Sequence, residues 1–78
     1  MNVVFTGTLT MSRSRETVKF KNFGINVQNA ITKSTNFLIK GDEPGSAKIN
    51  KANQYGIQIV SEKEFFAILE EEYPEYFL

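Results

Sequence analysis

The sequence predicts a small α/β domain built on a parallel sheet with helices on both faces. Short apolar runs rich in β-branched residues alternate with segments of helical periodicity, in the order β-α-β-β-α-β-α. Strands that alternate with helices are joined by right-handed crossovers and run parallel. A chain of 78 residues provides one domain only. We expect it to span residues 1–78, with a core at about 2–70 and an acidic, aromatic tail at 71–78.

The first strand and helix are predicted from an apolar run and its turn signals. Asn2–Thr6 is β-branched and apolar, and Gly7 ends it. Ser12 is the expected N-cap of a helix that runs to about Phe23 and stops at Gly24. Its core stripe recurs at every third position: Thr17, Phe20 and Phe23. Its remaining face is basic and carries Arg13, Arg15, Lys19 and Lys21.

The middle of the chain contains two short strands and a second helix. Residues 25–27 and 37–39 are predicted strands, separated by a polar loop. Residues 41–45 are dense in turn signals, and Ser46 is expected to cap a helix of about ten residues. The inward positions of this helix are predicted at Ile49, Ala52 and Asn53. The last strand is expected at Ile57–Val60.

A capping box marks the start of the last helix. Ser61 takes the N-cap position and Glu64 stands three residues later. The apolar residues that follow are expected to pack on the core: Phe65, Ile68, Leu69 and Phe66. The residues from Glu70 to Leu78 are acidic with aromatic punctuation, and they are expected either to fray or to dock.

Composition removes several classes of chemistry. The chain has no His and no Cys, so it offers no imidazole base, no thiolate and none of the usual zinc or haem ligands. Residues 41–48 lack the Gly-Lys-Ser/Thr of a phosphate loop, and three consecutive glutamates at 70–72 fan outward rather than converge. We therefore expect no catalytic residues, no metal and no cofactor. No apolar run approaches the roughly 20 residues of a membrane span, and the expected location is the cytoplasm.

Charge is segregated along a chain whose net charge is zero. Residues 1–41 contain six basic residues and one acidic residue, whereas residues 42–78 contain three basic and eight acidic residues. Such asymmetry can mark a face for an anionic partner, although on its own it is equally typical of solvated surface.

A more specific cluster is expected where the first strand ends. Thr6 and Gly7 lie at the carboxyl edge of the predicted sheet, the edge at which ligands collect in parallel α/β folds. The helix that begins near Ser46 starts at the same edge and carries Lys48 in its first turn, and Arg13 begins the earlier helix. A hydroxyl, free backbone N–H groups, a Lys and an Arg suit one phosphate. Each residue taken singly is better explained by local bonding or solvation; only the convergence favours a site.

At these residues the chain resembles a BRCT domain. The resemblance covers about Val3 to Leu69 and rests on the order and spacing of several pieces: Val-Val-Phe-Thr-Gly-Thr-Leu at 3–9, Met-Ser-Arg at 11–13, Phe-Gly at 23–24, the segment 31–39, the segment 45–52 and the segment 55–65. It is most similar to the BRCT domain at the carboxyl end of bacterial NAD-dependent DNA ligases, and it also looks like that of the eukaryotic clamp-loader large subunit.

The resemblance implies a three-layer fold with strand order 2-1-3-4 and a phosphate pocket. In the phosphopeptide-binding members, a hydroxyl residue and a Gly after the first strand and a Lys on the second helix hold the phosphate, and these map to Thr6, Gly7 and Lys48. In members that bind the 5′-phosphate of DNA an Arg joins them, which maps to Arg13, with Arg15 as the alternative. Further cations would contact the DNA backbone: Arg15, Lys19, Lys21 and Lys51.

Three functions stay open at this point. The first is a non-catalytic module that binds DNA ends or nicks through a 5′-phosphate, within a bacterial ligase or another replication or repair protein associated with the nucleoid. The second is a phosphopeptide or protein-docking module. The third is a scaffold that packs against other domains of its parent protein. An enzyme is the least favoured reading, because no acid–base or metal constellation is present.

Overall fold

Four strands form the middle layer of the computed structural model, which describes residues 1–78: β1 (Asn2–Thr6), β2 (Asn26–Gln28), β3 (Phe37–Lys40) and β4 (Gln58–Ser61). All three pairings are parallel, and the strand order is β2-β1-β3-β4. The predicted parallel sheet and its order are both confirmed. Because β1 lies between β2 and β3, its carboxyl end is flanked by neighbouring loops on both sides.

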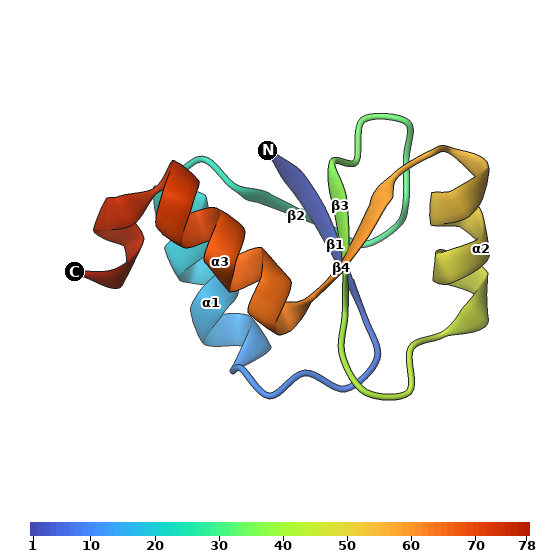
Figure 1. The fold of residues 1–78 in the computed structure, drawn as a ribbon, viewed down its shortest axis with the longest axis horizontal. Helices are drawn as coiled ribbons and strands as arrows, with labels where there is room; N and C mark the ends of the chain where they lie inside the picture. Colours follow the sequence, from blue (N-terminus) through green and yellow to red (C-terminus); the bar gives the residue numbers. More distant parts are fainter.

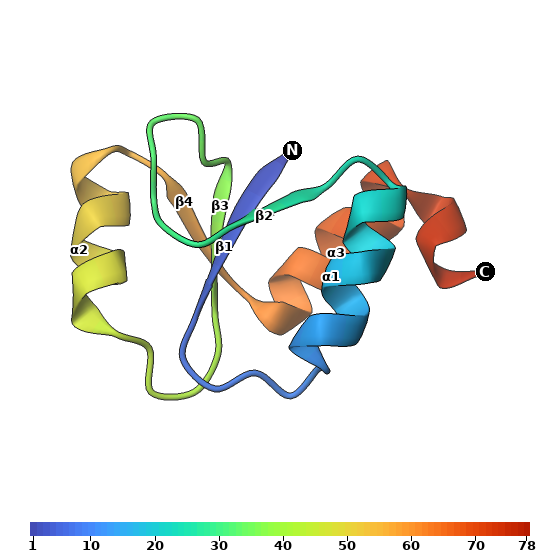
Figure 2. The same cartoon turned by 180° about the vertical axis from the view of Figure 1, so that it is seen from behind.

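Helices cover both faces of this sheet (Figure 1). One face carries α1 (Arg13–Asn22) and α3 (Glu62–Glu72), followed by a short 3-10 helix, η1 (Pro74–Phe77). The other face carries only α2 (Ser46–Gln54), which the view from behind also shows standing apart from the remaining helices (Figure 2). The outward surface of α2 is therefore covered by no other element of the fold.

The core is divided into two clusters by the alternation of side chains along the strands. On the side of α1 and α3, Phe20 packs against Phe5 and Phe65, with ring centroids 6.1 and 5.6 Å apart. On the side of α2, Val4 and Leu38 pack with Ala52 in a smaller cluster. Successive residues of β1 thus serve opposite layers, so Phe5 and Thr6 point to different faces of the sheet.

The C-terminal segment docks on the core. Tyr76 in η1 is 1% exposed and belongs to the larger cluster, with its ring centroid 5.3 Å from that of Phe23. Its hydroxyl donates a hydrogen bond to the Glu16 carboxylate on α1. Of the two alternatives left open for residues 70–78, the docked arrangement is the one that the structure shows.

Several predicted boundaries change by one residue. Gly45, not Ser46, is the N-cap of α2, because its backbone is extended and its N–H is taken by the Thr6 hydroxyl. The last strand begins at Gln58 rather than Ile57, since the Ile57 N–H instead bonds to the Ala52 carbonyl and ends α2. Asn53 is exposed and does not belong to the inward stripe of α2.

The predicted capping box at the start of α3 is confirmed. The Ser61 hydroxyl accepts from the Glu64 N–H at 3.1 Å, and the Glu64 carboxylate accepts from the Ser61 N–H at 2.9 Å. Ser12 takes the predicted N-cap position of α1, but its side chain makes no capping hydrogen bond. Two of the three helices therefore begin without a side-chain cap.

Candidate functional site

Thr6 joins the end of β1 to the head of α2. Its hydroxyl oxygen accepts a hydrogen bond from the Gly45 N–H at 3.0 Å, and the residue is 7% exposed. Thr6 thus has the local structural role that its position in a strand suggests. A hydroxyl that accepts one bond keeps its own proton to donate, and the Thr6 hydroxyl donates to no protein group.

Lys48 reaches back from the first turn of α2 to the same strand. Its ammonium donates to the Phe5 carbonyl oxygen at 2.9 Å, and the side chain is half-buried. This hydrogen bond holds the Lys48 side chain against β1 rather than leaving it extended in solvent. The bond also places the ammonium beside the residue that follows Phe5, which is Thr6.

The backbone between these two groups is tightly constrained at Gly7. Gly7 has a positive φ of 80°, and a Cβ at this position would lie 2.6 Å from the Asp42 carbonyl oxygen. Both facts require Gly here. The Gly7 N–H takes part in none of the turn and loop hydrogen bonds that surround it, such as the one from Thr8 N–H to the Asp42 carbonyl. Thr6, Gly7 and Lys48 therefore lie together at one end of β1.

The head of α2 adds backbone donors to this group. Gly45 provides no side-chain cap, and the first turn of α2 contains no acidic residue. The leading N–H groups of a helix have no partner within it, and they carry the positive end of its dipole. In α3, by contrast, the Ser61 hydroxyl accepts from the Glu64 N–H in the first turn.

Arg13 lies on the opposite side of β1. Its guanidinium carbon is 5.5 Å from the centroid of the Phe5 ring, which belongs to the cluster facing α1 and α3. Arg13 thus neighbours the Thr6–Lys48 pair across the sheet, through Phe5. Arg15 is exposed on the same helix, and no residue of the protein accepts a side-chain hydrogen bond from it.

The remaining basic candidates are spread over the molecule. Lys19 is half-buried, with its ammonium 4.2 Å from the centroid of the Tyr76 ring. Lys21 is exposed near the end of α1 and lines a surface hollow of about 310 Å³ beside β2. Lys51 is exposed on α2, one turn beyond Lys48. The structure does not bring these three cations together, since α1 and α2 cover opposite faces (Figure 1).

Glu62 is a structurally important residue that the sequence analysis missed. Its carboxylate accepts from the Thr10 hydroxyl at 2.7 Å, the Thr10 N–H at 2.9 Å and the Met11 N–H at 3.3 Å. Burial raises the pKa of this carboxyl, but the hydrogen bonds outweigh burial and hold the pKa below its usual value. Glu62 therefore fixes the loop that leads from the cluster to α1. Only its place next to a capping Ser could have drawn attention to it.

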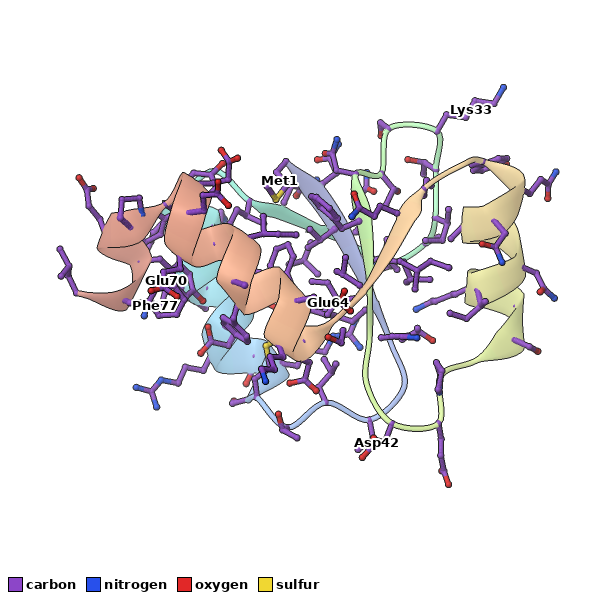
Figure 3. All side chains as sticks on the ribbon, in the orientation of Figure 1. Met1, Lys33, Asp42, Glu64, Glu70 and Phe77 are labelled. Carbon is purple, nitrogen blue, oxygen red and sulfur yellow. The ribbon has the colours of Figure 1, made fainter.

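The rest of the surface offers no competing chemistry. A second hollow, of about 350 Å³, lies beside α3 and is lined by both signs of charge, including Lys40, Asp42 and Glu62. Asp42 marks the turn between β3 and α2 in Figure 3. No group of three or more acidic, His or Cys residues could hold a metal ion. No helix combines the length and the apolar character needed to cross a bilayer.

The fold and this cluster define a class of small parallel α/β domain. In this class a hydroxyl residue at the end of the first strand and a lysine of the second helix lie at the same end of the sheet. The chain belongs to the BRCT family, since the family model for the BRCA1 C Terminus (BRCT) domain matches residues 1–69. The family resemblance seen in the sequence is confirmed. A BRCT domain is a non-catalytic module, and the expectation that this domain is not itself an enzyme agrees with that membership.

The chain is similar in sequence to segments of DNA ligases from several bacteria. The chain is 42% identical over 67 residues to the DNA ligase of Campylobacter hominis, which covers 86% of this chain. It is 37% identical over 73 residues to that of a Hydrogenobaculum species, covering 91% of this chain, and 35% identical over 69 residues to that of Aquifex aeolicus, covering 87%. In each case the match covers 10% of the ligase, so the chain spans about a tenth of the length of these relatives.

Proposed function

We propose that this domain binds the 5′-phosphate of a DNA end or nick, as the BRCT module of a bacterial DNA ligase. The observation that carries the proposal is that two bonds join the end of β1 to the head of α2: the Thr6 hydroxyl accepts from the Gly45 N–H, and the Lys48 ammonium donates to the Phe5 carbonyl. A phosphate there would accept from the Lys48 ammonium, the Thr6 hydroxyl and the Gly7 N–H. These are the donor types that bind phosphate at helix N-termini.

The proposed pocket is partly formed before any ligand binds. Lys48 is held by one bond to the Phe5 carbonyl and has two further protons to donate. Holding a side chain in place in advance lowers the entropy that binding must overcome. Arg13, placed over the Phe5 ring, would contact the same phosphate or the next one after a rotation of its side chain.

The parent protein is proposed from the relatives. All of the matched relatives described above are DNA ligases, and in each the matched segment is a small fraction of the protein. A module that binds a phosphate at the end of a strand would position such a protein at its substrate. Contacts to phosphate position a protein on a duplex without reading its sequence, so we expect no sequence preference.

The test is an NMR titration of the domain with a short duplex that carries or lacks a 5′-phosphate. We expect shifts at Thr6, Gly7, Arg13 and Lys48 with the phosphorylated duplex and much weaker ones without it. Lys48→Gln is expected to remove this difference. Lys33→Gln is the matched control, because Lys33 is exposed at the tip of the loop between β2 and β3 and points away from the cluster (Figure 3).

Three results would contradict the proposal, and the first two would identify its alternatives. An equal response of the same residues to a phosphoserine peptide would favour a phosphopeptide-docking module. No response to either probe would favour a scaffold that contacts other domains of its parent. Shifts confined to α1, with none at Thr6 or Lys48, would show that DNA contacts the face of the sheet opposite the proposed pocket.

A further inference from the structure

We propose that the strand held at its phosphate by Lys48 leaves the pocket along the side of α2 that carries Lys48, where Lys51 contacts the next phosphates and Tyr55 stacks on an unpaired base. The inference rests on the proposed function, because the track starts at the phosphate pocket. It extends that function by assigning a ligand form, an end with a few unpaired nucleotides, and a direction across the domain.

The surface of α2 that points away from the sheet is covered by no other helix or strand. This helix packs alone on its side of the sheet, and its exposed residues are mostly amides and lysine: Asn50, Lys51, Asn53 and Gln54. The segment from Ser46 to Tyr55 contains no Asp or Glu. The acidic residues nearest in sequence are Glu43 before it and Glu62 after it. A polyanion can therefore lie along this face without facing a carboxylate from α2 itself.

Three side chains form one stripe on this helix. Lys48, Lys51 and the C-cap residue Tyr55 stand at spacings of three and four residues, so they form one stripe along the edge of α2, from the half-buried Lys48 beside β1 to the exposed Lys51. Tyr55 is 36% exposed, and the Lys51 ammonium lies 5.8 Å from the centroid of its ring. At 1.5 Å of rise per residue the stripe is about 10 Å long, which exceeds the length of one nucleotide.

The chemistry of the stripe favours an unpaired strand over a duplex. Aromatic rings beside cations bind single strands by stacking on bases, whichever base is present. In a duplex the bases are stacked on one another and are not free to meet Tyr55. The cation–π contact keeps the ring and the ammonium close, so that one nucleotide can use both.

The basic face of α1 is a weaker route for the same strand. It lies across the sheet from Lys48, and the Lys19 ammonium is already placed over the Tyr76 ring. Its one carboxylate, Glu16, lies among the cations and is bonded to Tyr76. The sequence places four cations on the first helix and two, Lys48 and Lys51, on the second, and the fold shows that these two helices cover opposite faces of the sheet.

The experiment compares two 5′-phosphorylated duplexes, one blunt and one with a short 5′ overhang, by fluorescence anisotropy with the native domain. We expect the overhang to bind about fivefold tighter, the low end of the range for stacking one base. Tyr55→Leu keeps an apolar side chain but lacks a π face, and it is expected to remove that gain. Tyr55→Phe keeps the ring and is expected to retain it.

Failure of the track and failure of the pocket give different results. Equal affinity for the two duplexes, or a gain in affinity that survives Tyr55→Leu, would overturn the track. The pocket would still stand if the blunt duplex binds more tightly with its 5′-phosphate than without it. If the native domain binds blunt duplexes with and without a 5′-phosphate equally well, the pocket itself is overturned. Thermal unfolding of each variant, at a midpoint within a few degrees of the native one, verifies that the readout reports binding.

Discussion

Arg13 and Lys48 reach the same residue, Phe5, from opposite faces of the sheet. The Arg13 guanidinium lies 5.5 Å from the centroid of the Phe5 ring, and the Lys48 ammonium bonds to the Phe5 carbonyl at 2.9 Å. This arrangement follows from the pleat of β1, which turns the Phe5 side chain toward α1 and the next side chain, that of Thr6, toward α2. Two cations from helices that do not touch therefore flank the end of one strand.

Removing the charge of Lys48 is expected to affect binding more than folding. Lys48→Gln loses the hydrogen bond to the Phe5 carbonyl, which costs about 1 kcal/mol of stability and leaves the domain folded. The slope of log affinity for phosphorylated DNA against log salt is expected to fall by about 1, since one phosphate contact is lost. Urea unfolding and salt titration measure the two effects. A fully unfolded variant, or an unchanged slope, would contradict the role of Lys48.

The Thr6 hydroxyl is expected to contribute to both stability and phosphate binding. Thr6→Val keeps the shape of the side chain but leaves the Gly45 N–H without its acceptor, at a cost of about 1–3 kcal/mol. Thr6→Ser keeps the hydroxyl and is expected to lose less stability and to retain 5′-phosphate dependence. Urea denaturation and duplex titration of the pair measure this. Equal stability of Val and native domains would show that the bond to Gly45 contributes nothing.

Acid is expected to weaken the domain in part through Glu62. Because hydrogen bonds from Thr10 and Met11 hold its pKa below the ordinary value of 4.5, folding favours the charged form. The resulting stability is complete above about pH 4.5 and is lost as pH falls through the lowered pKa of the folded state. Glu62→Gln is expected to lose on the order of 1 kcal/mol at neutral pH, with a smaller difference in acid.

The control for this pH dependence is Glu70→Gln, which removes an exposed carboxylate that accepts no side-chain hydrogen bond. Unfolding free energies of the three proteins, measured in urea from neutral to acidic pH, carry the comparison. If the free energies of unfolding of the native and Glu62→Gln domains differed by the same amount at every pH, the charge of the Glu62 carboxylate would make no contribution to stability.

Tyr76 is expected to resist ionisation until the domain unfolds. Burial first, and then the hydrogen bond to Glu16 and its negative charge, raise the pKa of Tyr76 well above the ordinary value of 10.0. Its contribution to stability is complete below about pH 10 and decreases as alkali approaches the raised pKa. Tyrosinate absorbance during alkaline titration is expected to show that Tyr76 ionises late, together with unfolding of the domain.

Tyr76→Phe tests the same contact without a titration. It leaves the ring in the core but removes the donor to the half-buried Glu16 carboxylate, and about 1–2 kcal/mol of stability is expected to be lost. Glu16→Gln, which can still accept from the Tyr76 hydroxyl, is expected to lose less. Ionisation of Tyr76 at its ordinary pKa in the folded domain would contradict the docking of η1.

The regular secondary structure was predictable because its sequence signals are local. The strand Asn2–Thr6, the helix stop at Gly24 and the capping box at Ser61 and Glu64 each depend on a few adjacent residues, and each is found as expected. Two boundaries differ from the prediction, at Ser46 and at Ile57. The first depends on a partner distant in sequence, and the second depends on a hydrogen bond from Ile57 back to the end of α2. A hydroxyl of Thr6 on β1 takes the N–H of Gly45, and this contact decides where α2 begins.

By itself, the sequence determined the order of strands and helices, the absence of His and Cys chemistry, and the family to which the chain belongs. Only the tertiary structure decided which cations share a face. Lys48 and Lys51 stand on a helix that packs alone, whereas Arg13 lies across the sheet and Lys19 is held against Tyr76. The physical reason is that periodicity fixes which side of its own element a residue occupies, but only packing fixes what lies opposite that side.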